Sequence, residues 1–168
     1  MYDSILYPTD GSPAAQAAIE YARAQAEAFG ASIHVLYVVE VAHAGVGLAS
    51  DVDVETGGGM VGSPEGVGSG MIGVRERGGE LTSELESHAT EVVGRIADEF
   101  EGVETHEAVR TGIPADTILE YVDEADIDMV VMSTHGRSGL DRFLIGSVTE
   151  KVVRSSPVPV LTVQGSGD

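Results

Sequence analysis

Short apolar runs alternate with longer amphipathic stretches along most of this chain, and this alternation restricts its fold more than any other feature. Strands are predicted over 4–7, 33–39, 103–109, 128–132 and 158–163, and helices over 13–29, 80–101, 112–122 and 148–154. The resulting order is βαβαβαβαβ. Because crossovers between parallel strands are right-handed, this order predicts an α/β fold: an open five-stranded parallel sheet with helices on both faces.

Local signals support the first helix and the second strand. Ser12 is a helix-capping residue type, Pro13 follows it at a position where proline is favoured, and Gly30 provides a stop. Residues 33–39 are apolar almost throughout, which is typical of a strand buried on both faces. The chain is therefore expected to open with a buried βαβ unit.

Residues 42–79 differ in composition, with twelve glycines, no aromatic residue and no apolar periodicity. We interpret 1–168 as a single domain with a glycine-rich insertion at about 42–79. Residues 57–62 match G-x-G-x-x-G, but neither a strand before them nor a helix after them is predicted. Residues 51–55 begin like a calcium loop, but Thr56 occupies the glycine position. Neither match indicates a binding site.

Acidic residues dominate the charge. Asp and Glu total 28 against nine Lys and Arg, and the formal net charge is −19. Generic binding to nucleic acid or to an anionic membrane needs a basic surface, so the composition argues against both. Acid spread along a chain whose only lysine is Lys151 is typical of adaptation to high salt, where the Debye length shrinks to roughly 3 Å at molar concentration. The charge therefore predicts a halophilic habitat rather than a function.

The chain has no cysteine, which excludes disulfides and thiolate metal sites. Its first residues lack a basic stretch and a long apolar region, and no apolar run approaches the roughly 20 residues of a membrane span. We therefore expect a cytoplasmic protein with no membrane partner.

Two turns, at 8–12 and at 133–147, are rich in Gly, Ser, Thr and Asp and follow the first and fourth strands. In open parallel sheets, ligands bind beyond the carboxyl ends of the strands, where the strand order reverses. In the second turn, Ser147 and Glu150 fit a capping box, which needs no ligand. The glycines and Arg137 that precede them instead favour an anion such as phosphate, because a helix N-terminus offers free N–H groups. The residues alone leave both interpretations open.

The spacing Ser133-x2-Gly136-x9-Gly146-Ser147 resembles the signature G-x2-G-x9-G-[ST] of the universal stress protein (UspA-like) family in its ATP-binding branch. Ser133 stands where the first glycine is usual. The resemblance covers residues 1–40 and about 103–163. It implies a Rossmann-like fold of the adenine nucleotide alpha hydrolase type and, together with the charge, a halophilic archaeal source.

The resemblance also implies an adenine-nucleotide site formed by the two turns. Gly136, Gly146, Ser147 and Val148 would hold the phosphates through main-chain N–H groups and the Ser147 hydroxyl. Asp10 would lie near the ribose or near a Mg²⁺ ion held through the nucleotide. The expected cofactor is thus ATP or another adenine nucleotide with Mg²⁺.

The same resemblance places the rest of the nucleotide. Pro8, Thr9 and Val38 would frame the adenine, and Met132 and Ser133 would line the ribose side. Ser133 brings a Cβ and a hydroxyl that a glycine lacks, which would tighten the site. The expected nucleotide-binding set is completed by His135, Arg137 and Gly139.

These inferences predict an ATP-binding stress or regulatory protein that acts as a nucleotide-responsive homodimer. Pairing is implied through the last strand, 158–163, whose apolar edge would otherwise be exposed. A further protein partner would respond to the bound state. Two alternatives remain: a slow ATPase or autophosphorylating enzyme, for which neither a catalytic base nor a P-loop motif is visible, and a nucleotide-free dimerisation module.

Overall fold

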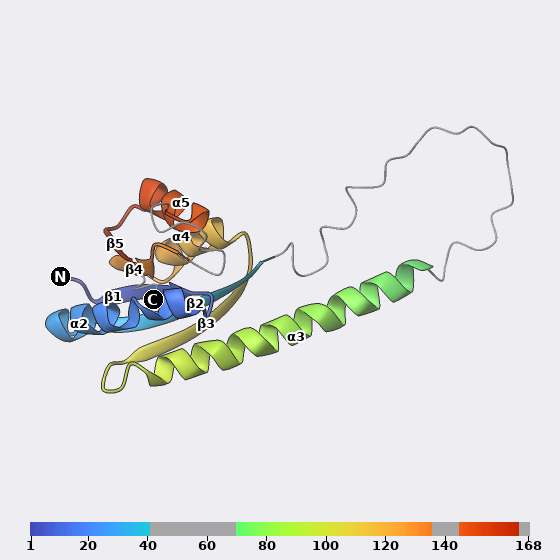
Figure 1. Cartoon of the computed structure of the whole chain (residues 1–168), viewed down its shortest axis with the longest axis horizontal. Helices are drawn as coiled ribbons and strands as arrows, with labels where there is room; N and C mark the ends of the chain where they lie inside the picture. Colours follow the sequence, from blue (N-terminus) through green and yellow to red (C-terminus); the bar gives the residue numbers. More distant parts are fainter. Residues whose placement is uncertain (41–69, 136–144, 165–168) are drawn as a thin grey trace, which may run out of the picture.

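The computed structural model describes residues 1–40, 70–135 and 145–164, and for residues 70–82 the backbone alone. The described residues form one parallel sheet in the order β3-β2-β1-β4-β5, with helices on both faces (Figure 1). The predicted α/β fold class is confirmed. The strands are β1 (Ser4–Thr9), β2 (Ser32–Glu40), β3 (Thr105–Gly112), β4 (Met129–Ser133) and β5 (Val160–Val163).

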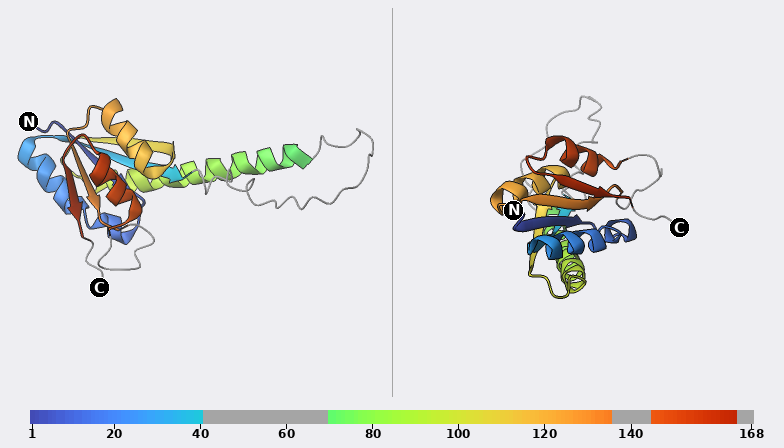
Figure 2. Two further views of the ribbon diagram at one scale, coloured as in Figure 1. Left: turned by 90° about the horizontal axis from the view of Figure 1, so that it is seen from above. Right: turned by 90° about the vertical axis from the view of Figure 1, so that its left-hand side faces the viewer.

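Two layers of helices sandwich the sheet (Figure 2). Helices α2 (Ile19–Phe29) and α3 (Gly70–Asp98) pack on one face, and α4 (Pro114–Glu124) and α5 (Ser147–Ser155) pack on the other. Strand β1 serves both layers because successive side chains point to opposite faces. Ile5 and Tyr7 belong to the first core, whereas Leu6 belongs to the second.

The predicted first helix over 13–29 is wrong as a continuous element. It divides into α1 (Pro13–Gln16) and α2, and the amide of Ala18 donates to the carbonyl of Ala15 at 3.1 Å. The buried hydroxyl of Tyr7 donates to the same carbonyl at 2.7 Å. A continuous helix would use this carbonyl for the amide of Ile19, so a hydroxyl from β1 accompanies the break. The predicted ends are confirmed: Ser12 caps α1, and Gly30 ends α2 in the left-handed region with φ of 69°.

The predicted helix over 80–101 is observed as α3, which begins at Gly70 and ends at Asp98. Its start therefore lies within the stretch interpreted as an insertion, of which residues 42–69 lie outside the described residues. The glycines in this part of the sequence predicted no helix, because each one disfavours a helix interior by about 1 kcal/mol. Figures 1 and 2 show the first half of α3 running out beyond the sheet.

The two edges of the sheet are β3 and β5. Strand β5 is shorter than the predicted 158–163, since Ser156 closes a local turn: its hydroxyl donates to the carbonyl of Val158 and accepts from the amide of the same residue. This turn keeps Val158 out of the ladder. Within the residues that the structure describes, none of the helices combines the length and the apolar character that a membrane span requires.

Candidate functional site

The strand order reverses between β1 and β4, which is where open parallel sheets place their ligands. The registered pairs between these strands are Ile5↔Met129 and Leu6↔Val130. On its other side, β1 stays paired with β2 through Thr9↔Tyr37. The last residues of β1 and β4 thus have no registered partner across this pair, so the two strands part toward their carboxyl ends.

The turn after β1 is held by its own side chains. The amide of Gly11 donates to Thr9 Oγ1 at 3.1 Å, the amide of Ser12 to Asp10 Oδ1 at 2.9 Å, and the amide of Ala15 to Ser12 Oγ at 3.2 Å. Asp10 therefore acts as a turn former, as its residue type allows. Three main-chain donors at this corner are already satisfied.

Glycine is required at position 11 of this turn. Its φ of 73° lies in the left-handed region, and a Cβ built there would lie 2.8 Å from Cγ1 of Val92 on α3. A side chain would meet both backbone strain and a packed neighbour. The contact joins the turn to α3.

The end of β4 is anchored to β5 and α5. The amide of Thr134 donates to the carbonyl of Val163 at 2.8 Å, and the hydroxyl of Thr149 donates to the carbonyl of Ser133 at 2.9 Å. Ser133 is buried, and its hydroxyl donates to the carbonyl of His135. The hydroxyl that replaces a glycine at this position is therefore bonded within the turn itself.

The start of α5 differs from the predicted capping box, which is wrong. Gly146 is the N-cap, and Ser147 is the first helical residue. The amide of Gly146 donates to the carbonyl of Thr134 at 2.7 Å, which ties the N-cap residue to the end of β4. The Glu150 carboxylate bonds Arg154 at 2.6 Å instead of reaching back to the cap.

No side chain among the described residues caps α5. The first internal bond is donated by the amide of Glu150 to the carbonyl of Gly146 at 2.8 Å, which leaves the amides of the preceding turn, Ser147 among them, without a helical acceptor. Ser147 is exposed and Val148 is half-buried. Free amides at the positive end of a helix dipole form an anion-binding arrangement.

A sequence model described as the universal stress protein family matches residues 1–164. The chain belongs to this family. The universal stress protein MJ0531 of Methanocaldococcus jannaschii is 33% identical over 164 residues, which are 98% of this chain and 83% of the relative. Membership confirms the resemblance found in the sequence.

Solved structures agree with the fold of this universal stress protein. The structure of MJ0577 from M. jannaschii is 26% identical, has a TM-score of 0.78, and is matched over 100% of this chain and 99% of its own. A universal stress protein from Archaeoglobus fulgidus in complex with dAMP is 20% identical, has a TM-score of 0.53, and is matched over 96% and 97% of the two chains. The second likeness shows the fold alone.

The structure brings most of the predicted nucleotide residues of this universal stress protein to the carboxyl ends of the strands. Pro8 and Thr9 end β1, and Val38 lies on β2 one residue beyond the last β1 pair. Asp10 lies in the turn after β1, Ser133 ends β4, and His135 lies in the turn after it. Gly146 is the N-cap of α5, and Ser147 and Val148 are its first residues. Met132 differs from this set because its side chain is 5% exposed and packs in the second core, so a ligand would meet its backbone. Three predicted residues lie outside the described residues: Gly136, Arg137 and Gly139.

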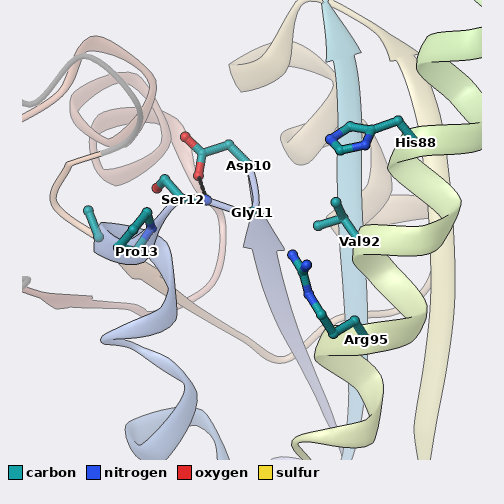
Figure 3. Close-up of a pocket in the computed structure, with 8 residues that line it drawn as sticks. Asp10, Gly11, Ser12, Pro13, His88, Val92 and Arg95 are labelled. Carbon is teal, nitrogen blue, oxygen red and sulfur yellow. Dashed lines mark hydrogen bonds between the residues drawn. The ribbon is translucent and has the colours of Figure 1, made fainter.

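A hollow of about 400 Å³, which no pattern in the sequence predicted, lies between residues 10–14 and α3 (Figure 3). Of the predicted site residues, this hollow borders Asp10. His88, Val92 and Arg95 line its other wall. Their spacing of four and three residues places them on one helical face, and this spacing was the signal that could have grouped them.

Proposed function

We propose that this universal stress protein binds an adenine nucleotide, ATP or a close relative with Mg²⁺, and acts as a nucleotide-responsive homodimer. The observation that supports this most is a pair of features at the carboxyl ends of β1 and β4. The β1–β4 ladder stops at Leu6↔Val130, and α5 starts there without a side-chain cap. The proposal retains the halophilic, cytoplasmic setting that the composition predicts.

The phosphates are assigned to the start of α5. Its free amides and the exposed hydroxyl of Ser147 would donate to phosphate oxygens, with the helix dipole adding positive potential. Glycine suits position 146, since a Cβ there would lie 3.2 Å from the carbonyl oxygen of Thr134. In a chain of net charge −19, such fixed donors matter because the overall field repels a polyanion.

Mg²⁺ fits this site as an ion shared with the nucleotide. Within the described residues, no three His, Cys, Asp or Glu side chains gather as a ligand set. Asp10 supplies a carboxylate whose orientation is fixed by the bond from the Ser12 amide. Mg²⁺ prefers one or two carboxylates together with phosphate oxygens and water, and when bound it would neutralise phosphate charge.

The base is assigned to the space beyond the end of β1. Strand β2 continues to Glu40 along β3, whereas its pairing with β1 ends at Tyr37, so Val38 has no β1 neighbour. Pro8 and Thr9 are buried residues of β1 and would border this space on one side. The dAMP complex of the A. fulgidus protein supports an adenine nucleotide as a ligand that this fold accommodates.

The homodimer is assigned to β5. This edge strand has half-buried side chains at Val160, Leu161 and Thr162, and an unpaired apolar edge favours a second strand. Helix α5 leads directly into β5. A nucleotide held at the first turn of α5 would therefore act on the segment that forms the dimer, and a further protein partner would meet the altered surface.

The Ser147→Pro variant tests the nucleotide site most directly. Proline removes the amide and the hydroxyl, yet it is favoured at the first helical position, and Gly146 already has the φ of −60° and ψ of 150° that a residue before proline prefers. The matched control, Ser147→Ala, keeps the amide. By calorimetry with Mg-ATP in molar KCl, we expect Ser147→Pro to weaken binding roughly tenfold or more and Ser147→Ala to weaken it less.

Light scattering on the same samples, with and without Mg-ATP, tests the homodimer. A dimer whose stability changes with nucleotide is expected. Absence of binding heat in the wild-type chain would leave the nucleotide-free dimerisation module as the better description. Turnover of ATP during the titration would favour the enzymatic alternative.

A further inference from the structure

The hollow between residues 10–14 and α3 has a wall of mixed chemistry. On α3, His88 and Arg95 flank Val92, whose side chain meets Gly11 (Figure 3). Pro13 and Ala14 add apolar surface on the opposite side. A volume of about 400 Å³ is in the range of small-molecule sites.

Arg95 stands out because of the charge of the chain. Acidic residues outnumber basic ones 28 to nine, so an arginine has many carboxylates available. In the part of the chain whose side chains are described, Arg95 nevertheless has no ion pair or hydrogen bond. The other described basic side chains each have a partner: Arg23 bonds the carbonyl of Glu99, Arg110 pairs with Glu124, Lys151 with Asp116, and Arg154 with Glu150.

The directions of the Arg95 and His88 side chains agree with the lack of an ion pair at Arg95. Figure 3 shows Arg95 extending from α3 toward the turn at Gly11, and His88 lying on the same side of the helix. Asp10 borders the hollow, but its carboxylate points away from both basic groups and accepts from the amide of Ser12. Both basic side chains are exposed at the rim of the hollow, and the carboxylate of Asp10, which also borders it, is turned away from them.

We propose that this hollow is a second small-molecule site, which binds a small phosphate-bearing compound. The guanidinium of Arg95 matches two phosphate oxygens with paired N–H donors, and the His88 ring offers a further donor. The body of the ligand rests on Val92, Pro13 and Ala14. Because Gly11 joins the turn to α3, a ligand here contacts the segment that carries Thr9 and Asp10, and so bears on the nucleotide site.

The test uses the full chain, isotope-labelled, with inorganic phosphate as the probe and chloride holding the ionic strength constant. We expect the His88 ring signals, assigned through His88→Gln, and the Gly11 amide signal to shift together and to saturate. Arg95→Gln is expected to weaken this titration at least tenfold, and Arg95→Lys to weaken it less because the charge stays while the paired donors are lost. Arg154→Gln, at an exposed ion pair on α5, is the matched control and is expected to change nothing.

Two further titrations distinguish this proposed site from the proposed nucleotide site. Ser147→Pro, which disables the proposed nucleotide site, is expected to keep the phosphate titration at His88. Shifts at His88 that occur with Mg-ATP and not with inorganic phosphate would mean that the group in the hollow belongs to the nucleotide, and the second site would be wrong. Linear, unsaturated shifts, or equal titrations in wild type and Arg95→Gln, would also overturn it.

Discussion

The turn after β1 and the start of α5 both begin a helix where the strand order reverses, yet they treat their main-chain amides in opposite ways. In the first, the side chains of Thr9, Asp10 and Ser12 accept from the amides of the turn. In the second, Gly146 has no side chain to offer, and no side chain among the described residues caps the amides that follow. The first turn is closed by its own side chains, whereas the second has the open amides on which the proposed phosphate site depends.

Composition alone therefore does not distinguish a self-capped helix start from an open one. Both segments are rich in Gly, Ser, Thr and Asp, and each has a serine near the first turn of its helix. What separates them is one position: Ser12 is the N-cap of α1, whereas Ser147 lies one residue inside α5. A serine at the cap satisfies the helix, and a serine one step later leaves it open.

The largest effect is expected from a side chain at Gly11, which would disrupt the first turn. Gly11→Ala combines a left-handed φ with a Cβ 2.8 Å from Val92 Cγ1, so we expect it to lower the free energy of unfolding by about 3 kcal/mol. Gly30→Ala is the matched control: its φ of 69° is similar, but nothing lies within 4 Å of the added Cβ. Denaturant unfolding in molar KCl compares the two.

The Gly11–Val92 contact can be isolated in the same experiment. Gly30→Ala is expected to cost about 1 kcal/mol, from the backbone alone. The loss caused by Gly11→Ala should then be smaller in a Val92→Ala background than in wild type. Equal losses in the free energy of unfolding for Gly11→Ala and Gly30→Ala would show that the contact with Val92 on α3 adds no cost.

A smaller effect is expected from Tyr7→Phe, which removes the bond from β1 to α1. The hydroxyl donates to the carbonyl of Ala15 at 2.7 Å, and the ring, edge-on to Phe100 at 5.6 Å, would stay in place. We expect a loss of about 1 kcal/mol in the free energy of unfolding. The Ala15 carbonyl would still accept from the amide of Ala18, so the fold is retained.

The same tyrosine predicts a pH dependence. Burial raises the pKa of Tyr7 well above its ordinary value, so the unfolded chain releases this proton at a lower pH than the folded one. The stability that Tyr7 contributes is thus fully present below the unfolded pKa of about 10 and is lost as pH rises beyond it. Unfolding measured at successive alkaline pH values should show a steeper decline for wild type than for Tyr7→Phe, and parallel declines would contradict this origin.

Much of the fold could be predicted because its signals are local. Apolar runs located β1, β2, β4 and β5, and Ser12 with Pro13 located the start of α1. Strand β3 is mostly polar, and its bounds differ from the predicted 103–109. The errors arose where a distant group decides. The break between α1 and α2 coincides with the bond from the hydroxyl of Tyr7 to Ala15, and no feature of the alanine-rich run indicates it.

The candidate site also has a part that local sequence signals predicted and a part that depends on tertiary contacts. The motif around Gly146 and Ser147 is readable from spacing, but which of the two residues caps α5 depends on the bond from the Gly146 amide to Thr134. The hollow at Arg95 could not be predicted, because it exists only when α3 packs beside the turn at Gly11. Spacing alone assigns His88 and Arg95 to a solvated helix face.

The smallest expected effects come from Ser12 and Ser147. Substituting each one tests whether its hydroxyl caps the helix that it begins. Ser12→Ala removes a buried hydroxyl that accepts from the amide of Ala15, so we expect a loss of about 1 kcal/mol in the free energy of unfolding. Ser147→Ala removes an exposed hydroxyl that caps nothing, and a change within about 0.5 kcal/mol is expected. Denaturant unfolding without nucleotide compares them. If Ser147→Ala proved as costly as Ser12→Ala, the hydroxyl at 147 would be a cap after all, and the amides of α5 would not be free to receive a phosphate.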